Sequence, residues 1–376
     1  MSKHTICTRC IMDLSDPDIS FKDGLCNHCV RYEDQKSNRL NLGENSDGKL
    51  DNLLNQIKKG GRGKDYDCII GVSGGVDSTY VAHFLVSKGI RPLAVHFDNG
   101  WNSELAVSNI EKMIEKLNID LYTYVMDWNI FKNIQVAFLK ASIPDGEIPT
   151  DHAINSVLLD LAKKFKSKYI INGMNFTTEG MAVPAWSYGH SDWIYIKNII
   201  KKFSQNKSDF KSLPHYSLFK LAYFLIIKRV KIVSILNYIP YNKDNVIEII
   251  KKDLDYRPYE QKHYESVYTR FYQGFYLVEK FGYDKRRCHY SDLIRSNQLT
   301  RQEALTSIKK PPYINTSELE IDKEFVLKKL GLSNNDFDKI INEKNKSHEN
   351  YKNQKNIISK MKTLYNYLRR KGIQSK

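Results

Sequence analysis

Short apolar runs and stretches of helical spacing alternate along residues 67–174. Four of the runs are rich in β-branched and aromatic residues, which is typical of buried strands, and they span residues 67–72, 91–98, 120–125 and 169–174. Helical spacing separates them at residues 79–85, 103–117 and 151–165. Strands that alternate with helices form a parallel sheet with helices on both faces. The pattern therefore predicts an α/β fold, a doubly wound parallel sheet.

The alternation stops after residue 183, and the pattern divides the chain into four regions. We expect a zinc-binding N-terminal segment, an α/β domain, a helical insertion or subdomain, and a basic helical C-terminal region that binds substrate or phosphate; their bounds are 1–45, 46–183, 184–255 and 256–376. Residues 218–233 are both basic and strongly apolar. A buried helix is the favoured interpretation, because apolar stripes usually face a core. Peripheral contact with a membrane, or a face for a partner, is the alternative.

Composition adds a charge to this picture. Hydrophobic residues at 41% and charged residues at 27% are typical of a soluble protein. The 58 basic residues outnumber the 43 acidic ones, and the net charge of +15 favours anionic partners such as nucleotides, a sugar nucleotide, RNA or a membrane surface. No uncharged apolar run is long enough to span a bilayer. The start, Met-Ser-Lys-His-Thr, has no apolar signal region, so a cytoplasmic location is expected.

The loop after the first predicted strand has the chemistry of a phosphate cradle. Its glycines let backbone N–H groups approach an anion, and the following helix points its positive end at the same place. Hydroxyl groups add donors, and Asp77 adds a carboxylate that could hold Mg²⁺. The loop has neither a Gly-Lys-Ser/Thr ending nor a Gly-x-Gly-x-x-Gly motif, which excludes a Walker A loop and a dinucleotide fingerprint. The predicted cradle residues are Ser73, Gly74, Gly75, Asp77, Ser78 and Thr79.

The strand-loop sequence Ser-Gly-Gly-Val-Asp-Ser resembles the loop of the ATP pyrophosphatases, which cleave ATP between its α and β phosphates. In a doubly wound sheet, ligands bind beyond the carboxyl ends of the strands. Asp98 and Gly173 lie at two other strand ends and are expected to bound the adenosine pocket. A glycine turn that only caps a helix is the alternative.

Four of the six cysteines form two Cys-x-x-Cys pairs, Cys7 with Cys10 and Cys26 with Cys29. Two such pairs can place four thiolates around one Zn²⁺ ion, and a full sulfur shell indicates a structural site. The short polar segment between the pairs has no core of its own, so metal binding would supply much of its folding free energy. A redox pair or a chance cluster is the alternative, and His28 and His4 are alternative ligands.

A second cluster, at residues 256–291, is dense in cations and aromatic side chains. Preorganised Lys and Arg side chains stabilise the charge that grows on a departing pyrophosphate. Candidates for this role are Lys262, Arg270, Lys285 and Arg286. An exposed basic pair of helices fits the same residues equally well.

Together these motifs resemble the N-acetyl sugar amidotransferases of lipopolysaccharide and surface-sugar biosynthesis, the WbpG-type family within the HUP-like PP-loop ATP pyrophosphatases. The stretches that carry the resemblance are the Cys-Thr-Arg-Cys-Ile-Met-Asp opening with its second cysteine pair, Val-Ser-Gly-Gly-Val-Asp-Ser, Pro-Thr-Asp-His-Ala-Ile at 149–154, and Lys-His-Tyr-Glu-Ser with the following Thr-Arg-Phe, Asp-Lys-Arg-Arg and Ser-Asp-Leu-Ile-Arg-Ser.

The resemblance implies that an acetamido group on a sugar or sugar nucleotide becomes an acetamidino group, with ATP converted to AMP and pyrophosphate. It implies catalytic roles for Asp77, Lys262, His263, Arg270 and Lys285. Substrate contacts are expected from Asp151, His152, Arg286 and Glu265, although Asp151 is equally suited to cap a helix. Glu179 is a weaker second ligand for Mg²⁺. The implied cofactors are ATP, Mg²⁺ and structural Zn²⁺.

In this family a separate glutaminase subunit supplies ammonia, with a barrel subunit that conducts it. The chain agrees with that arrangement, because it contains no Gly-x-Cys-x-Gly nucleophile elbow and has Ser at position 2. A tRNA-thiolating ATP pyrophosphatase is the main alternative function, but Cys68 lies within a predicted strand and Cys288 has no Cys-x-x-Cys partner. A non-catalytic zinc-ribbon RNA-binding protein is the other. No nucleic acid partner is expected.

Overall fold

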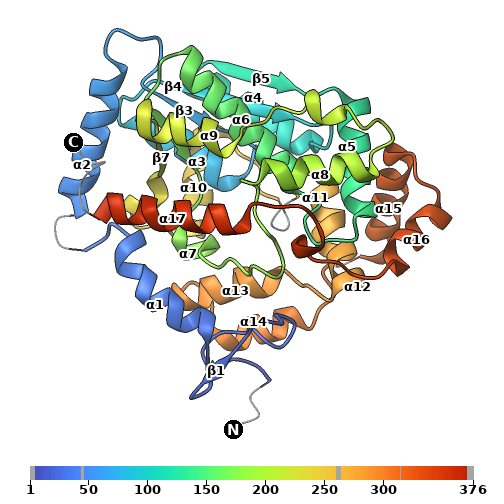
Figure 1. The fold of residues 1–376 in the computed structure, drawn as a ribbon. Coiled ribbons are helices and arrows are strands. Elements are labelled where there is room, and N and C mark those ends of the chain that lie inside the picture. Colours follow the sequence, from blue (N-terminus) through green and yellow to red (C-terminus); the bar gives the residue numbers. More distant parts are fainter. Residues whose placement is uncertain (1–4, 44–45, 260–263, 314, 371–376) are drawn as a thin grey trace.

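The computed structural model describes residues 5–43, 46–259, 264–313 and 315–370 of the chain. Its centre is a five-stranded sheet in the order β5-β4-β3-β6-β7, in which every strand runs parallel to its neighbours (Figure 1). The strands are β3 Cys68–Gly71, β4 Pro92–Asp98, β5 Leu121–Val125, β6 Tyr169–Asn172 and β7 Lys231–Ser234. The chain winds outward from β3 to β5 and then returns to add β6 and β7 on the other side of β3. The predicted doubly wound parallel sheet is confirmed.

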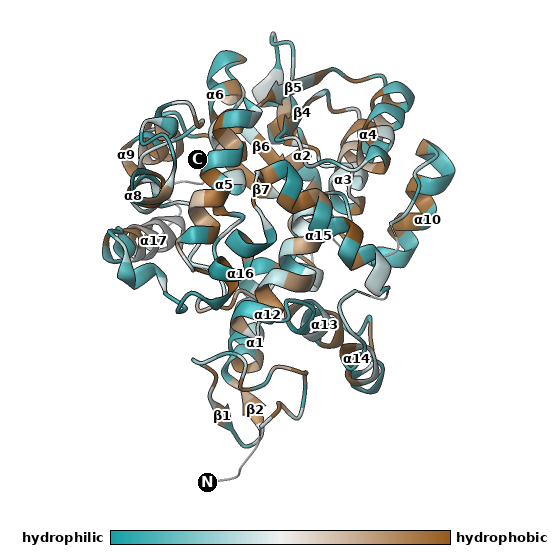
Figure 2. Ribbon diagram, turned by 90° about the vertical axis from the view of Figure 1, so that its right-hand side faces the viewer, coloured by the Kyte–Doolittle hydropathy of each residue, from teal (hydrophilic) through white to brown (hydrophobic). Residues whose placement is uncertain are grey.

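Helices cover both faces of the sheet. Ile70 in β3 packs with residues of the helices on one face, which are α2 Ser46–Gly61, α3 Val76–Ser87, α4 Glu104–Leu117 and α10 Lys243–Leu254. Its neighbour Ile69 points into a second core with helices of the other face, α5 Trp128–Lys140, α6 Ile148–Lys164 and α8 Trp193–Phe203. Alternate strand residues thus feed two cores, as the pleat requires. Figure 2 shows hydrophobic and hydrophilic residues alternating along the outer helices, as expected for helices that bury one face.

The fifth strand comes from the segment at 218–233 that we expected to form a buried helix. The segment begins as α9 Leu218–Ala222, continues as the π-helix η2 Tyr223–Ile227, and ends in β7 at the sheet edge. Leu218 and Phe224 are buried, but Phe219 is 88% exposed and Ile227 67% exposed. Only one side of this helix therefore faces the core. The expectation of a buried helix is wrong for the exposed side and for residues 231–233, which belong to β7. The strand was missed because its partner, β6, lies some sixty residues earlier in the chain.

The C-terminal region is helical, as predicted. Its elements are α11 Val267–Phe271, the π-helix η4 Tyr272–Tyr276, α12 Leu277–Phe281, α13 Arg286–Arg295, α14 Arg301–Ile308, α15 Thr316–Leu330, α16 Asn334–Asn342 and α17 Lys355–Arg370. The N-terminal segment contains β1 Phe21–Lys22, β2 Leu25–Cys26 and α1 Asn27–Arg39, and it lies against α13 and α14 (Figure 1). Short elements complete the chain: α7 Phe176–Glu179, η1 Asp209–Lys211, η3 Ile235–Tyr238 and η5 His348–Asn350. Among the described residues, none of the helices combines the length and the apolar composition that a bilayer span requires.

Candidate functional site

The glycine loop joins β3 to α3 at the point where the strand order reverses. Gly74 has φ +78°, and a Cβ atom there would lie 2.5 Å from the carbonyl oxygen of Ala106 in α4. A side chain is therefore excluded both by backbone conformation and by space. Gly75 is the N-cap of α3, and no side chain caps that end of the helix. The first amide groups of α3 are consequently available to an anion.

The loop opens into a cavity of about 810 Å³. The cavity joins the loop to the residues that follow β6 and to the C-terminal helices, so it brings together positions up to about 240 residues apart. Ten of the predicted site residues line it: Ser73, Gly75, Asp77, Ser78, Gly173, Glu179, Glu265, Arg270, Lys285 and Arg286. Lys262 and His263 lie outside the described residues, so their roles stay predictions.

Two carboxylates stand at the loop end of the cavity. Asp77, in the first turn of α3, accepts a hydrogen bond from the hydroxyl of Tyr241. The pKa of Tyr241 is raised well above its usual range, first by burial, next by Asp77 and to a smaller extent by Glu179. Both carboxylates therefore act on the same phenol. Carboxylate oxygens are the ligands that Mg²⁺ prefers, and a Mg²⁺ ion beside bound phosphates takes one or two of them. Asp77 and Glu179 fit that requirement.

Glu265 closes the cradle from the C-terminal side. A Cβ atom on Gly75 would lie 2.5 Å from Oε1 of Glu265, so this glycine is needed for the close approach of the carboxylate. The backbone oxygen of Glu265 accepts from the amide of Ser103, and the hydroxyl of Tyr259 donates to the carbonyl oxygen of Gly74 at 3.0 Å. The C-terminal region thus contacts the loop directly, which local sequence signals did not indicate.

The predicted phosphate-binding cations are already paired with carboxylates. Arg270 donates to both oxygens of Asp322 at 2.6 Å and to Glu318 at 2.8 Å. Arg286 binds Asp284 in the same forked manner, with its shortest contact at 2.6 Å, and Lys285 lies 3.6 Å from Glu147. An incoming phosphate would have to share these cations with carboxylates that hold them in place.

Two lysines that the sequence did not single out line the same cavity. Within the described part of the chain, Lys243 and Lys310 form no ion pair. They are therefore better suited than Arg270 to receive an anionic substrate. Their only sequence signal is a basic side chain near an element end, which many lysines share.

Three predicted residues lie away from the cavity lining. Thr79 is buried within α3, at 1% exposure. Asp98 accepts hydrogen bonds from the amide of Gly100 at 2.8 Å and from the side chain of Asn102 at 3.3 Å, so its carboxylate shapes the turn after β4. Gly74 contacts α4 and forms the back of the loop.

His152 is also placed away from the cavity, in the core between α6 and α8. Its Nδ1 lies 2.6 Å from the carbonyl oxygen of His190, and its Nε2 accepts from the amide of Tyr216. The rings of Tyr216 and Trp193 stack on its two sides. Burial lowers the pKa of His152 to about 4. The side chain is a neutral core residue, so the expected substrate contact is corrected.

Asp151, in the first turn of α6, is exposed to solvent. Desolvation by nearby protein atoms raises the pKa of its carboxyl group, against a lowering by His190. The helix is capped at Glu147 without a side-chain hydrogen bond, so Asp151 is not an N-cap. Its expected contact with substrate or ammonia stays a prediction.

The four N-terminal cysteines converge in a buried cluster in which all four sulfur atoms lie within 4.8 Å of one another. The Sγ atoms of Cys7 and Cys29 are 3.9 Å apart, and those of Cys10 and Cys26 are 3.7 Å apart. A tetrahedral ion with bonds of about 2.3 Å to sulfur holds its ligands about 3.8 Å apart. The spacing therefore fits one mononuclear ion. His28 is not a ligand, because its Nε2 lies 2.6 Å from Asp16 in a buried pair.

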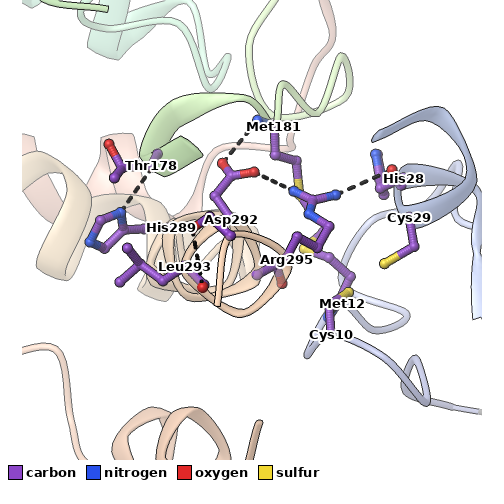
Figure 3. Close-up of polar contacts among 12 residues, drawn as sticks. Cys10, Met12, His28, Cys29, Thr178, Met181, His289, Asp292, Leu293 and Arg295 are labelled. Carbon is purple, nitrogen blue, oxygen red and sulfur yellow. Dashed lines mark hydrogen bonds and ion pairs between the residues drawn. The ribbon is translucent and has the colours of Figure 1, made fainter. Parts of the chain in front are cut away.

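Helix α13 connects this cluster to the cavity (Figure 3). Arg295 forms a buried ion pair with Asp292 and donates to the carbonyl oxygen of His28 at 3.2 Å. Asp292 also accepts from the amide of Met181 at 2.9 Å. From α14, Arg301 donates to the carbonyl oxygens of Cys7 and Cys10. His289, on the cavity side of α13, is held at Nδ1 by the carbonyl oxygen of Thr178.

Neither remaining cysteine lines the cavity. Cys68 is fully buried within β3, and Cys288 packs beside the four-cysteine cluster. Burial raises the thiol pKa of both above its usual range. Both thiols are therefore kept protonated.

Comparisons with known proteins give one family match. Residues 265–365 match the model of the LPS biosynthesis protein WbpG-like, C-terminal domain. A curated relative, the tRNA-specific 2-thiouridylase MnmA of Desulfosudis oleivorans, is 30% identical over 78 residues, which are 20% of this chain and 22% of that protein. The chain thus spans about a fifth of the length of the curated relative it matches.

Solved structures show only distant similarity. The NMN synthetase of Francisella tularensis shares 15% identity with a TM-score of 0.36, covering 77% of this chain and 97% of that one. The U34-tRNA thiolase NcsA of Methanococcus maripaludis, solved with its [4Fe-4S] cluster, shares 14% identity with a TM-score of 0.37, covering 87% and 89%. The family match covers the basic cluster beyond residue 264 that carried the resemblance. Residues 265–365 of this chain thus match the WbpG-like C-terminal domain, and they are joined here to a doubly wound parallel sheet and a four-cysteine N-terminal cluster.

Proposed function

We propose that this chain is an ATP-dependent amidotransferase that converts the acetamido group of a sugar or sugar nucleotide into an acetamidino group. One observation carries the proposal: the glycine loop, with its uncapped helix end, opens into the same cavity as the WbpG-like region. The cavity volume of about 810 Å³ is near the upper end of the range of about 300–1,000 Å³ for ligand pockets. That size suits a site that holds two substrates.

In the proposed reaction, the amide oxygen of the sugar attacks the α-phosphorus of ATP. The bond from that phosphorus to the bridging oxygen breaks, and pyrophosphate leaves with the electron pair. The amides of α3 and the hydroxyls of Ser73 and Ser78 would receive the negative charge of the pyrophosphate. Asp77 and Glu179 would hold Mg²⁺, which neutralises phosphate charge when bound.

The second step transfers nitrogen. Ammonia attacks the imidate carbon, AMP leaves with the oxygen that came from the amide, and a proton is lost to give the amidine. Adenylation is needed because an amide oxygen is a very poor leaving group. Lys243 and Lys310, which line the same cavity, would hold the sugar nucleotide. We propose that a glutaminase subunit, with a barrel subunit, delivers the ammonia in the cytoplasm to which we assign the chain.

The structural Zn²⁺ of the proposal would occupy the four-cysteine cluster, whose sulfur spacing suits one tetrahedral ion.

A tRNA-thiolating activity is the second candidate, favoured by the 78-residue match to a tRNA-specific 2-thiouridylase and by the net charge of +15. Two observations weigh against it. Both cysteines outside the cluster are kept protonated and away from the cavity, and a persulfide route needs a reactive thiolate there.

The test is mass spectrometry of candidate acetamido sugar nucleotides incubated with the chain, ATP, Mg²⁺ and ammonium. The expected product is lighter by the difference between O and NH, with AMP and pyrophosphate formed in equal amounts. Asp77→Asn should abolish pyrophosphate release, whereas Asp244→Asn, which removes a carboxylate from the cavity lining outside the glycine loop, should retain it. Formation of ADP, or sulfur transfer to tRNA in place of the amidine, would overturn the proposal.

A further inference from the structure

One side of the molecule exposes large apolar side chains on two helices that are distant in the sequence. On the helix formed by α9 and η2, the exposed apolar residues are Phe219, Tyr223, Ile226 and Ile227. On α17 they are Ile357, Leu364 and Tyr367. Figures 1 and 2 both show α9 and α17 on the same side of the molecule, with α8 beside them. We call these seven residues and the basic side chains around them the apolar–basic face.

The local structure explains why these side chains point outward. The helix of α9 and η2 begins at Ser217, whose hydroxyl caps it, and it buries Leu218 and Phe224 against the body. The opposite side therefore faces solvent, and Phe219 there is 88% exposed. Residues 357 and 364 are seven apart, which places their side chains on one stripe of α17. Ile357 and Leu364 are 51% and 56% exposed.

The charged side chains within these two segments are all basic. Residues 210–243 and residues 351–376 contain no Asp or Glu. Lys228 and Arg229 follow η2 directly and are exposed, and Lys360 is exposed on α17. The acidic partners that two of the nearby lysines have, Asp160 and Glu349, come from neighbouring elements.

The combination of exposed apolar and basic side chains distinguishes between two possible partners of this face, another protein and a lipid bilayer. The core of a protein–protein interface is depleted of charged residues, and Lys in particular is rare there. A surface that inserts into the interfacial layer of a bilayer instead pairs Phe, Leu, Ile or aromatic side chains with Lys and Arg, which attract anionic lipids. We propose that the apolar–basic face binds the surface of an anionic phospholipid bilayer, with the tip of η2 inserted and the basic side chains at the headgroups. The proposal does not depend on the reaction assigned to the cavity.

Cosedimentation of the full chain with phosphatidylcholine vesicles, with and without phosphatidylglycerol, tests the inference. We expect binding to the anionic vesicles only, weakened by salt because exposed charges are screened. Replacing Lys228 and Lys360 by Gln should weaken binding by about fivefold for each charge removed, the effect typical of a basic residue near an anionic surface.

Two matched substitutions isolate the apolar contribution. Ile227→Ser, combined with Phe219→Ser, should release the chain from anionic vesicles. Ile321→Ser is the control, because Ile321 lies on α15 and is 66% exposed against 67% for Ile227. The control should leave binding unchanged, and all variants should keep the activity of the cavity.

Three results would overturn the inference. The first is a wild-type chain that stays in the supernatant with anionic vesicles. The second is equal binding by the Phe219→Ser/Ile227→Ser and Ile321→Ser variants. The third is a chain that is dimeric in gel filtration and becomes monomeric in the double variant, which would assign the face to a second copy. Loss of amidotransferase activity in every assay would leave the vesicle result unaffected.

Discussion

Replacing His152 by Asn should make the folded state less sensitive to acid. In the folded chain both ring nitrogens are engaged, one with the carbonyl of His190 and the other with the amide of Tyr216. Burial holds the pKa of His152 at about 4, whereas a histidine in an unfolded chain has a pKa of about 6.5. Between these values the unfolded state binds more protons than the folded state. The free energy of unfolding therefore falls as the pH falls through this window.

The size of the effect follows from the two pKa values. At pH 5 the solution is about 1.5 units below the pKa of the unfolded histidine, and one unit is worth about 1.36 kcal/mol. The folded side chain is still mostly neutral there, so His152 alone should lower the free energy of unfolding by about 2 kcal/mol between pH 7 and pH 5.

Asn can donate to the carbonyl of His190 but has no proton to gain in this window. At pH 7 the variant should be less stable by about 1–3 kcal/mol, because the amide of Tyr216 loses its acceptor. Its further loss between pH 7 and pH 5 should be about 2 kcal/mol smaller than that of the wild type. Urea denaturation followed by tryptophan fluorescence at both pH values measures the difference.

His83→Asn is the matched control, since His83 lies beside Asp253 on the opposite side of the sheet and keeps solvent contact. It should retain the wild-type loss between pH 7 and pH 5. An unchanged pH dependence in the His152→Asn variant would refute the reasoning. A stable variant with a raised KM for the sugar substrate would instead restore a substrate role to this histidine.

Three other predictions follow from the contacts. Metal analysis should find one zinc and no iron per chain, and iron with acid-labile sulfide would contradict the mononuclear site. Cys26→Ser should abolish zinc binding and lower the melting temperature by several degrees, because metal binding is part of the folding free energy of the N-terminal segment. Gly74→Ala should destabilise the chain by more than Gly63→Ala, because Gly63 has a similar positive φ but open space around it, and Gly74→Ala should also abolish ATP binding in isothermal titration. Equal losses of stability in the two variants would mean that the contact with Ala106 does not restrict position 74. Arg270→Met should lower the free energy of unfolding by about 3–5 kcal/mol, because it leaves the buried Asp322 without its charged partner. Arg9→Met, in an exposed pair with Glu33, should change it by less than about 1 kcal/mol, and similar values for both would refute a structural role for Arg270.

The features that the sequence predicted well are those encoded over short stretches. The two cysteines of a Cys-x-x-Cys pair are close in space because they are close in sequence. The Ser-Gly-Gly loop between a strand and a helix forms its cradle from its own residues. Apolar runs also located β3, β4 and β6, because strands buried on both faces need continuous apolar residues. The partly exposed edge strand β5 was located by its β-branched and aromatic residues.

What sequence reasoning missed depends on contacts between distant segments. Tyr241 reaches Asp77 across 164 positions, and Tyr259 reaches Gly74 across 185. The charge of Arg270 looked available until the fold placed Asp322 against it. His152 was expected to contact the substrate, but two aromatic rings from later segments enclose it. No local pattern reports such partners.

The position of α13 suggests how the cavity wall in the C-terminal region depends on the four-cysteine cluster at the N-terminus. One side of this helix supports the four-cysteine cluster through Arg295, and the other side contributes His289 and Leu293 to the cavity. The glycine loop, in contrast, follows β3 and packs against α4, and this strand and helix share the core on one face of the sheet. A metal ion bound to the cysteines would therefore stabilise the wall that faces the proposed sugar site and leave the ATP cradle largely independent. In the proposed reaction, separate supports of this kind would let the sheet bind ATP while the attached C-terminal region determines which amide is adenylated.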